Sequence, residues 1–128
     1  MAATPESELL DISLKLLKAI DAGDWATYAG FCDEHITCFE PEANGHLVTG
    51  LPFHKFYFDL PGSGASRQST PASPHVRVIG DVGIVCYPRV VQKLDSSGAP
   101  ITVCADETRI WHRIGGKWKH IHFHRSPC

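Results

Sequence analysis

Two runs of aromatic and β-branched residues lie on either side of a Gly-Gly pair near the end of the chain. The runs span residues 106–113 and 117–125, and the pair is Gly115-Gly116. Consecutive glycines accept the positive φ angles of a tight turn, so this stretch predicts two strands joined as a hairpin. This is the strongest structural signal in the sequence, and any fold for the chain has to accommodate it.

Side chains alternate between the two faces of a strand, so the hairpin can be sorted by face. Basic residues then fall beside large apolar ones, which indicates either the rim of a core or a pocket for an anion. Arginines whose stems lie on apolar surface are the commoner case. The expected groups are Arg109, Trp111 and Arg113 on the first strand, and Ile121, Phe123 and Arg125 on the second.

The preceding residues predict helices followed by strands. Thr4 is a predicted N-cap before Pro5, and Gly23 is predicted to end a long helix with an apolar stripe at Leu9, Ile12, Leu16, Leu17 and Ile20. Further elements are expected as helices at 25–31 and 53–58, strands at 36–40, 46–49, 75–79 and 83–94, and a strand from 101 onward. Residues 61–74, rich in Gly, Ser, Pro and Ala, predict a loop.

This order predicts an α+β fold. We expect a cone-shaped, curved antiparallel sheet wrapped on the long N-terminal helix, with two shorter helices on the same side. Pro88 falls within the strand at 83–94 and predicts a bulge or an unpaired edge there, because proline cannot donate to a ladder.

Length and charge exclude several classes of protein. The chain has 128 residues, 43% of them apolar, which suits one domain covering residues 1–128. The net charge of -2 argues against nucleic acid, and there is no apolar run of the roughly 20 residues that a membrane helix needs. The five cysteines lack Cys-x-x-Cys spacing and predict reduced, mostly buried thiols in a cytoplasmic protein.

Three predicted strands each carry an arginine among apolar neighbours: Arg89, Arg109 and Arg125. If the three faces coincide on the concave side of the sheet, three guanidinium groups meet in one cavity. Such a cluster is costly unless carboxylates neutralise it. Glu40, Glu42 or a bound carboxylate can do so, because a guanidinium binds a carboxylate through two parallel hydrogen bonds.

A metal site is a weaker alternative. His120, His122 and His124 alternate and are predicted to share one face of the last strand, where three imidazoles could bind zinc. Histidines on the less buried face of a sheet are commoner, so we predict no metal. No nucleotide or nucleophile motif is present, and we expect no cofactor.

The acidic pairs are open to two interpretations. Glu40 and Glu42 flank Pro41 and suit a general acid and base if both face one pocket, but a salt bridge to a sheet arginine is the commoner role. The pair Asp106-Glu107 is predicted to be solvated charge at a turn or strand end.

Several segments closely resemble the association (hub) domain of calcium/calmodulin-dependent protein kinase II. The resemblance covers nearly the whole chain, from about residue 8 to 126. It is carried by Phe39-Glu40-Pro41-Glu42-Ala43, Phe53-His54-Lys55-Phe56-Tyr57-Phe58, Glu107-Thr108-Arg109-Ile110-Trp111-His112-Arg113, Gly116-Lys117-Trp118 and His122-Phe123-His124-Arg125-Ser126.

The resemblance implies the cone of the nuclear-transport-factor-2-like superfamily and assembly into two stacked rings, in total about 12 to 18 subunits. It implies a non-catalytic hub, here without a kinase domain, that gathers kinases of this type. It also implies a cavity that binds small carboxylates through Arg89, Arg109 and Arg125, with His54 close by. For the subunit interface we predict the aromatic helix with Phe53, Phe56, Tyr57 and Phe58.

A small cavity enzyme is the alternative. Many cones of this superfamily are isomerases, dehydratases or cyclases, and Glu40, His54 or Tyr87 could supply acid–base groups. A pocket for an apolar substrate is itself mostly apolar, whereas three arginines favour an anion. The hub is therefore the preferred interpretation.

Overall fold

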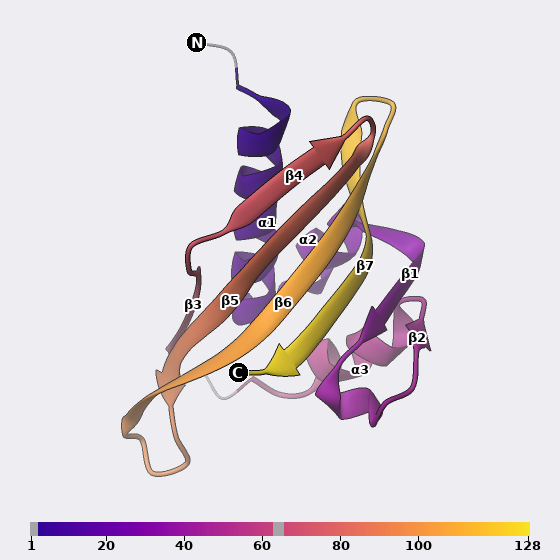
Figure 1. Ribbon diagram of the computed structural model, residues 1–128. Coiled ribbons are helices and arrows are strands. Elements are labelled where there is room, and N and C mark those ends of the chain that lie inside the picture. Colours follow the sequence, from indigo (N-terminus) through magenta and orange to yellow (C-terminus); the bar gives the residue numbers. More distant parts are fainter. Residues whose placement is uncertain (1–2, 63–65) are drawn as a thin grey trace.

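The computed structural model describes residues 3–62 and 66–128. Helices and strands follow in the expected order, with all three α-helices on one side of a curved sheet (Figure 1). The helices are α1 (Pro5–Ala22), α2 (Trp25–Phe31) and α3 (Pro52–Asp59), with a short 3-10 turn at Pro41–Ala43. The strands are β1 (Cys32–Phe39), β2 (Val48–Thr49), β3 (Arg67–Pro71), β4 (His75–Ile79), β5 (Val82–Leu94), β6 (Pro100–Ile114) and β7 (Lys117–Pro127).

The first helix begins and ends where the sequence predicts. The Thr4 hydroxyl accepts a hydrogen bond from the Ser7 amide, and the Ser7 hydroxyl accepts one from the Thr4 amide, which completes a capping box. Gly23 closes the helix at φ 66°, a left-handed conformation that costs glycine little. Leu9, Leu16 and Leu17 are buried along the predicted stripe.

The sheet has the order β2-β1-β7-β6-β5-β3, and β4 pairs with the other half of β5. Every pairing is antiparallel except that of β1 with β7, which is parallel. The α+β class and the cone are confirmed, but the sheet is mixed rather than purely antiparallel. β1 directly follows α2 and lies beside β7, the last strand of the chain. The other strands of the sheet lie between β1 and β7 in the sequence, and only such a long connection allows two strands to pair in parallel.

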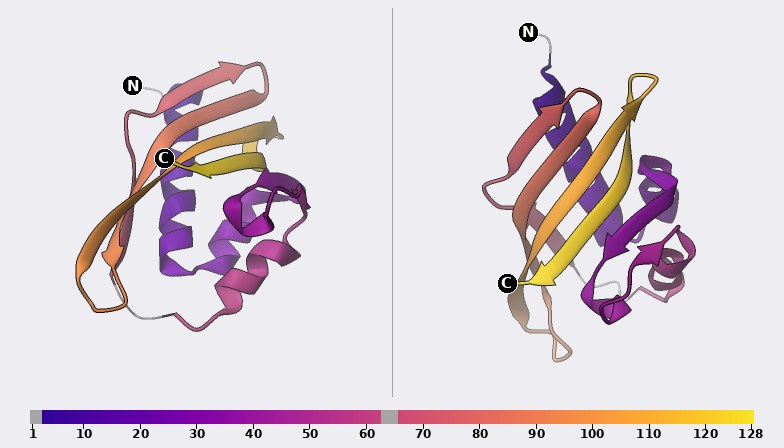
Figure 2. Two further views of the ribbon diagram at one scale, coloured as in Figure 1. Left: turned by 60° about the horizontal axis from the view of Figure 1, so that its bottom comes forward. Right: turned by 45° about the vertical axis from the view of Figure 1, so that its right-hand side comes forward.

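The core lies between α1 and the concave face of the sheet, which bends around the helix (Figure 2). Trp111 of β6 is completely buried there, together with Leu9 and Leu16. The helix passes so close to β5 that a Cβ atom built on Gly83 would lie 2.2 Å from Leu9 Cδ2. Any side chain at position 83 would therefore force the buried Leu9 side chain to move.

The prediction of a loop over residues 61–74 is wrong at its centre, where β3 forms. For residues 63–65 the loop prediction lies outside the described residues. Asp21 at the end of α1 accepts hydrogen bonds from the Ser69 amide at 2.8 Å and from the Ser69 hydroxyl at 2.9 Å. Partners distant in sequence thus hold a segment of low strand propensity against β5.

Pro88 lies where the partner of β5 changes. β4 pairs with residues up to Cys86, and β3 pairs with residues from Arg89 onward. The two predicted alternatives are a bulge and an unpaired edge, and the structure shows the second. A bulge is absent at this position, since the register between β5 and β6 runs through Pro88 without a shift. Proline is tolerated because its nitrogen is not needed as a donor at this gap.

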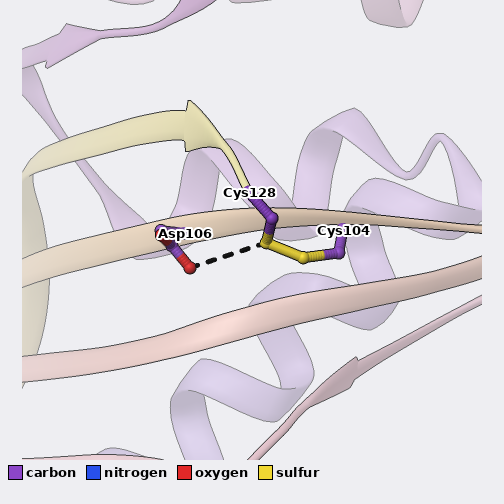
Figure 3. The surroundings of a disulfide bond; sticks show 3 residues. All are labelled: Cys104, Asp106 and Cys128. Carbon is purple, nitrogen blue, oxygen red and sulfur yellow. Dashed lines mark hydrogen bonds between the residues drawn. A yellow bond between two sulfur atoms is a disulfide. The ribbon is translucent and has the colours of Figure 1, made fainter.

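The prediction that all five cysteines are free thiols is wrong for two of them. Cys104, which lies within β6, forms a disulfide with Cys128, which directly follows β7 (Figure 3). Ala105 is paired with Pro127, so the next positions, 104 and 128, lie opposite each other. Asp106 Oδ1 lies 3.6 Å from the Cys128 sulfur, a contact rather than a donated hydrogen bond because a bonded sulfur carries no proton. Cys32 and Cys38 are free and buried.

Candidate functional site

A cavity of about 250 Å³ lies between the sheet, the end of α1 and helix α3. The structure places five of the six predicted cavity residues on its wall. Tyr87 is the exception: it does not line the cavity, but its hydroxyl accepts a hydrogen bond from Arg109 Nε at 2.9 Å. The lining residues are Ile20, Tyr28, Glu40, Glu42, His54, Tyr57, Phe58, Arg67, Arg89, Arg109, Phe123 and Arg125.

Glu107 is the centre of the buried charge network. Its Oε1 accepts from Tyr87 Oη at 2.8 Å and from Arg109 Nη2 at 3.0 Å, and its Oε2 accepts from Arg89 Nη1 at 3.3 Å. The prediction that Glu107 is a solvated charge is wrong, because Glu107 is only 2% exposed. Strand alternation turns Asp106 to the outer face and Glu107 inward beside Arg109, two residues away. That spacing was a signal the sequence offered.

The network keeps Glu107 and Arg109 ionised. Burial alone would raise the pKa of Glu107, but Arg109, Arg89 and the Tyr87 hydroxyl together hold it below its usual value. Burial would lower the pKa of Arg109, and Glu107 and Tyr87 raise it instead. Burial also raises the pKa of Tyr87 to about 12, so its hydroxyl stays a donor.

Asp21 is a second acidic partner that sequence reasoning missed. Arg89 Nη2 donates to Asp21 Oδ1 at 3.3 Å, while Arg89 Nε donates to Ser69 Oγ at 2.9 Å. Arg67 Nε also donates to Asp21 Oδ1, at 3.0 Å. Asp21 therefore joins α1, β3 and β5 at one side of the cavity. It lies at the C-terminal turn of a helix, where no local pattern marks it as an arginine partner.

Arg125 faces the two predicted acidic residues at the mouth of the cavity. It donates through Nη2 to Glu42 Oε2, and the same nitrogen lies 3.5 Å from Glu40 Oε2. The salt-bridge interpretation of Glu40 and Glu42 thus fits the geometry. Burial and then Glu42 raise the pKa of Glu40. Burial alone would also raise the pKa of Glu42, but the hydrogen bond from Arg125, a backbone hydrogen bond and the charge of Arg125 together lower it.

His54 lies on α3 and reaches the cavity from the helix side. Its Nδ1 lies 3.5 Å from Glu40 Oε1, and its Nε2 lies 3.4 Å from the Cys38 sulfur. Burial, and next Arg109, lower the pKa of His54 to about 4. The imidazole is therefore neutral near pH 7, and a ring nitrogen can accept a proton or coordinate a metal ion.

The three alternating histidines of β7 do not share a face, which corrects the prediction. Trp111 pairs with His120 and Ile110 pairs with His122, so Ile121 is the extra residue of a β-bulge. The bulge turns His120 into the core beside Trp111, where it is completely buried, while His122 and His124 lie on the outer face. Ile121 is likewise displaced from the face of Phe123 and Arg125.

Helix α3 divides its aromatic residues between the core and the surface. Phe53 and Phe58 pack against the core, and Phe58 contacts the rings of Trp25 and Tyr28 at 5.2 and 5.0 Å between centroids. Phe56 is 61% exposed and Tyr57 is 42% exposed. Two large aromatic residues thus remain on the surface of one chain.

Nearly the whole chain matches a known family. Residues 5–128 match the family model of the calcium/calmodulin dependent protein kinase II association domain. This chain belongs to the CaMKII association-domain family. The resemblance seen in the sequence is thereby confirmed.

Individual members of the family are similar over nearly the full chain. The chain is 43% identical over 124 residues to the delta subunit of calcium/calmodulin-dependent protein kinase type II from Oryctolagus cuniculus; the match covers 94% of this chain but 23% of the rabbit protein. The solved CaMKII hub homology domain of Chlamydomonas reinhardtii is 46% identical with a TM-score of 0.93, covering 98% of this chain and 99% of that one.

The wider fold is also shared. A nuclear transport factor 2 (NTF2-like) superfamily protein from Salmonella enterica superposes with a TM-score of 0.77 at 18% identity, covering 95% of this association domain and 89% of that chain. This likeness concerns the fold alone.

No helix within residues 3–62 and 66–128 is long and apolar enough to cross a membrane.

Proposed function

We propose that this association domain is a non-catalytic oligomerisation hub that assembles with copies of itself into a closed double ring. The observation that carries the proposal is the family match over residues 5–128, together with the close likeness to a solved hub homology domain. The exposed Phe56 and Tyr57 on α3 support it, because large aromatic residues are enriched in buried interface centres. A kinase of the CaMKII type is the proposed client, and the cytoplasm stays the predicted location.

Native mass spectrometry tests the assembly. We expect one discrete species with an even number of 14.1 kDa subunits, twelve or more, because self-complementary patches favour closed symmetry. The variant Phe56→Glu should shift the population to smaller species, since a charge in an apolar interface loses its hydration.

The matched control is Ile114→Glu, which changes an apolar residue that is 53% exposed at the hairpin end of β6. This variant should keep the wild-type mass. A wild-type protein that remains monomeric at micromolar concentration would show that the chain is not a self-assembling hub.

We further propose that the cavity binds small carboxylates. The support is the wall itself, where Arg109 and Arg125 lie with the neutral His54 around about 250 Å³ of space. Arg109 is already paired with Glu107 and Arg125 with Glu42, so a ligand must use the donors that these pairs leave free. A guanidinium has five N–H donors, and its partners here use only some of them.

A thermal-shift experiment with 4-hydroxybutyrate as the probe tests the cavity. At a hundredfold excess over the dissociation constant, binding to the folded state stabilises it by about 2.7 kcal/mol, which raises the melting temperature by several degrees. Arg125→Ala should reduce this response, whereas Arg113→Ala should not, because Arg113 pairs with Asp81 outside the cavity. Equal responses in both variants would assign Arg125 a structural role only.

The enzyme alternative has one supporting observation, the Glu40 and His54 pair in the cavity. The rest of the wall argues against it. An apolar substrate needs a mostly apolar pocket, and here four guanidinium groups reach the wall. The hub is therefore the function that the site and the family support best.

A further inference from the structure

Three potential metal ligands gather at the cavity wall. Cys38 points inward from β1, Glu40 follows the end of that strand, and His54 lies in the first half of α3. One ligand atom from each lies within 4.8 Å of the other two. The closest approach is 3.4 Å, between the Cys38 sulfur and His54 Nε2. Bonds to zinc of about 2.3 Å from sulfur and about 2.0 Å from nitrogen, at a tetrahedral angle, separate such ligands by about 3.5 Å.

One atom of this cluster has no hydrogen-bond partner. Glu40 Oε1 is fully buried and receives no hydrogen bond from any part of the chain that the structure describes. Its approach to His54 Nδ1 at 3.5 Å is too long and misaligned to count as one. Arg125 faces the other oxygen, Oε2. A buried carboxylate oxygen left without a partner is costly, so an oxygen in this state indicates a missing ligand.

The charges around the cluster admit a divalent cation. Arg109 and Arg125 are the nearest positive groups, and three carboxylates, those of Glu40, Glu42 and Glu107, face them. With Arg67, Arg89 and Asp21, which join the same network, four carboxylates face four guanidinium groups. Loss of the Cys38 proton then adds one negative charge, which offsets part of the charge of a divalent ion.

We propose that Cys38, Glu40 and His54 bind zinc, with an open coordination position toward the cavity. The donor set of one sulfur, one nitrogen and one oxygen suits Zn²⁺. Glu40 and His54 line the cavity wall, so an ion can enter there and a water or a carboxylate can complete its coordination. The carboxylate has to move closer to the other two ligand atoms, which its soft terminal torsion allows. As the Zn–S bond forms, the thiol releases its proton to solvent.

The ligand atoms are in different states before binding. His54 is neutral, so one ring nitrogen already offers its lone pair. Burial, and then Glu40, raise the pKa of Cys38 to about 12, so its proton must be displaced. Affinity for the ion should therefore increase as the pH rises.

Cobalt titration tests the site. Co²⁺ is added to the purified chain in buffer without thiol reductants, so that Cys104 and Cys128 remain bonded. We expect one Co²⁺ per chain, with the intense near-ultraviolet absorption of a cobalt–thiolate bond, and displacement of that signal by Zn²⁺. Cys38→Ala should lose the thiolate band, and Glu40→Gln should bind at least tenfold more weakly, the smallest effect expected even for an outer-sphere partner.

Cys32→Ala is the matched control. Cys32 is also buried and its sulfur lies 3.6 Å from His120 Nδ1, but among residues 3–62 and 66–128 it belongs to no cluster of potential ligands with a carboxylate. This variant should keep the band and the affinity. Circular dichroism checks that each variant is folded, and Cys38→Ser replaces Cys38→Ala if the latter is not. Absence of a thiolate band in the wild type, or equal binding by the wild type and Cys38→Ala, would overturn the proposal.

Discussion

Replacing Glu107 with glutamine should lower the free energy of unfolding by about 3–5 kcal/mol, the usual cost of removing one partner from a buried ion pair. The change leaves the guanidinium of Arg109, which is 2% exposed, without its carboxylate and takes one of two carboxylates from Arg89. Urea denaturation followed by circular dichroism measures the loss. The proposed assembly would couple stability to protein concentration, so all variants are compared at one concentration.

Asp106→Asn is the matched control for this experiment. It removes the same charge one residue earlier, on the outer face, where the side chain is exposed. Its effect should stay within about 0.5 kcal/mol. A loss of less than about 1 kcal/mol for Glu107→Gln, near the cost of an ordinary single substitution, would mean that Asp21 and Tyr87 alone satisfy the two arginines.

Opening the disulfide should have the second large effect. Cys104 and Cys128 are 24 residues apart in sequence, and closing a loop of about that length removes enough unfolded-state entropy to contribute about 3 kcal/mol. Reduction, or the variant Cys128→Ser, should therefore lower the free energy of unfolding by that amount. Denaturation of the oxidised protein with and without a phosphine reductant measures the difference.

Two comparisons make the disulfide result specific. Cys86→Ser changes a free, half-buried cysteine and should retain the sensitivity to reductant, whereas Cys128→Ser should abolish it. Arg125 is three residues before Cys128, so the bond also anchors the strand end that carries the arginine at the cavity mouth. Identical denaturation curves for the oxidised and reduced wild type would contradict the prediction.

Local features of the fold were predictable from residues that are close in sequence. The cap at Thr4, the left-handed Gly23 and the apolar stripe of α1 involve neighbours no more than one or two turns apart. The same holds for the turn at Gly115 and Gly116, whose φ angles of 58° and 77° only glycine adopts at little cost. The family resemblance was also visible in the sequence, because its motifs are long and cover nearly the whole chain.

The candidate site was predictable in composition but not in its pairing. Arg89, Arg109 and Arg125 do reach one cavity, as alternation along β5, β6 and β7 implied. The acid that pairs with two of them was missed, although Glu107 and Arg109 are spaced to share a face. Residue type alone favours solvent for an acidic pair, and only the burial of β6 shows which member turns inward.

The chain sequence thus determined most of the elements, the fold class and the family, since capping, periodicity and turn chemistry act over short distances. The tertiary structure decided how distant segments meet. A single bulge at Ile121 reverses the faces of every later residue of β7, so His120 is buried and His122 is not. The register of β6 and β7 brings Cys104 opposite Cys128, and the end of α1 brings Asp21 to β3. Register and docking depend on the packing of the whole domain, and no local pattern carries them.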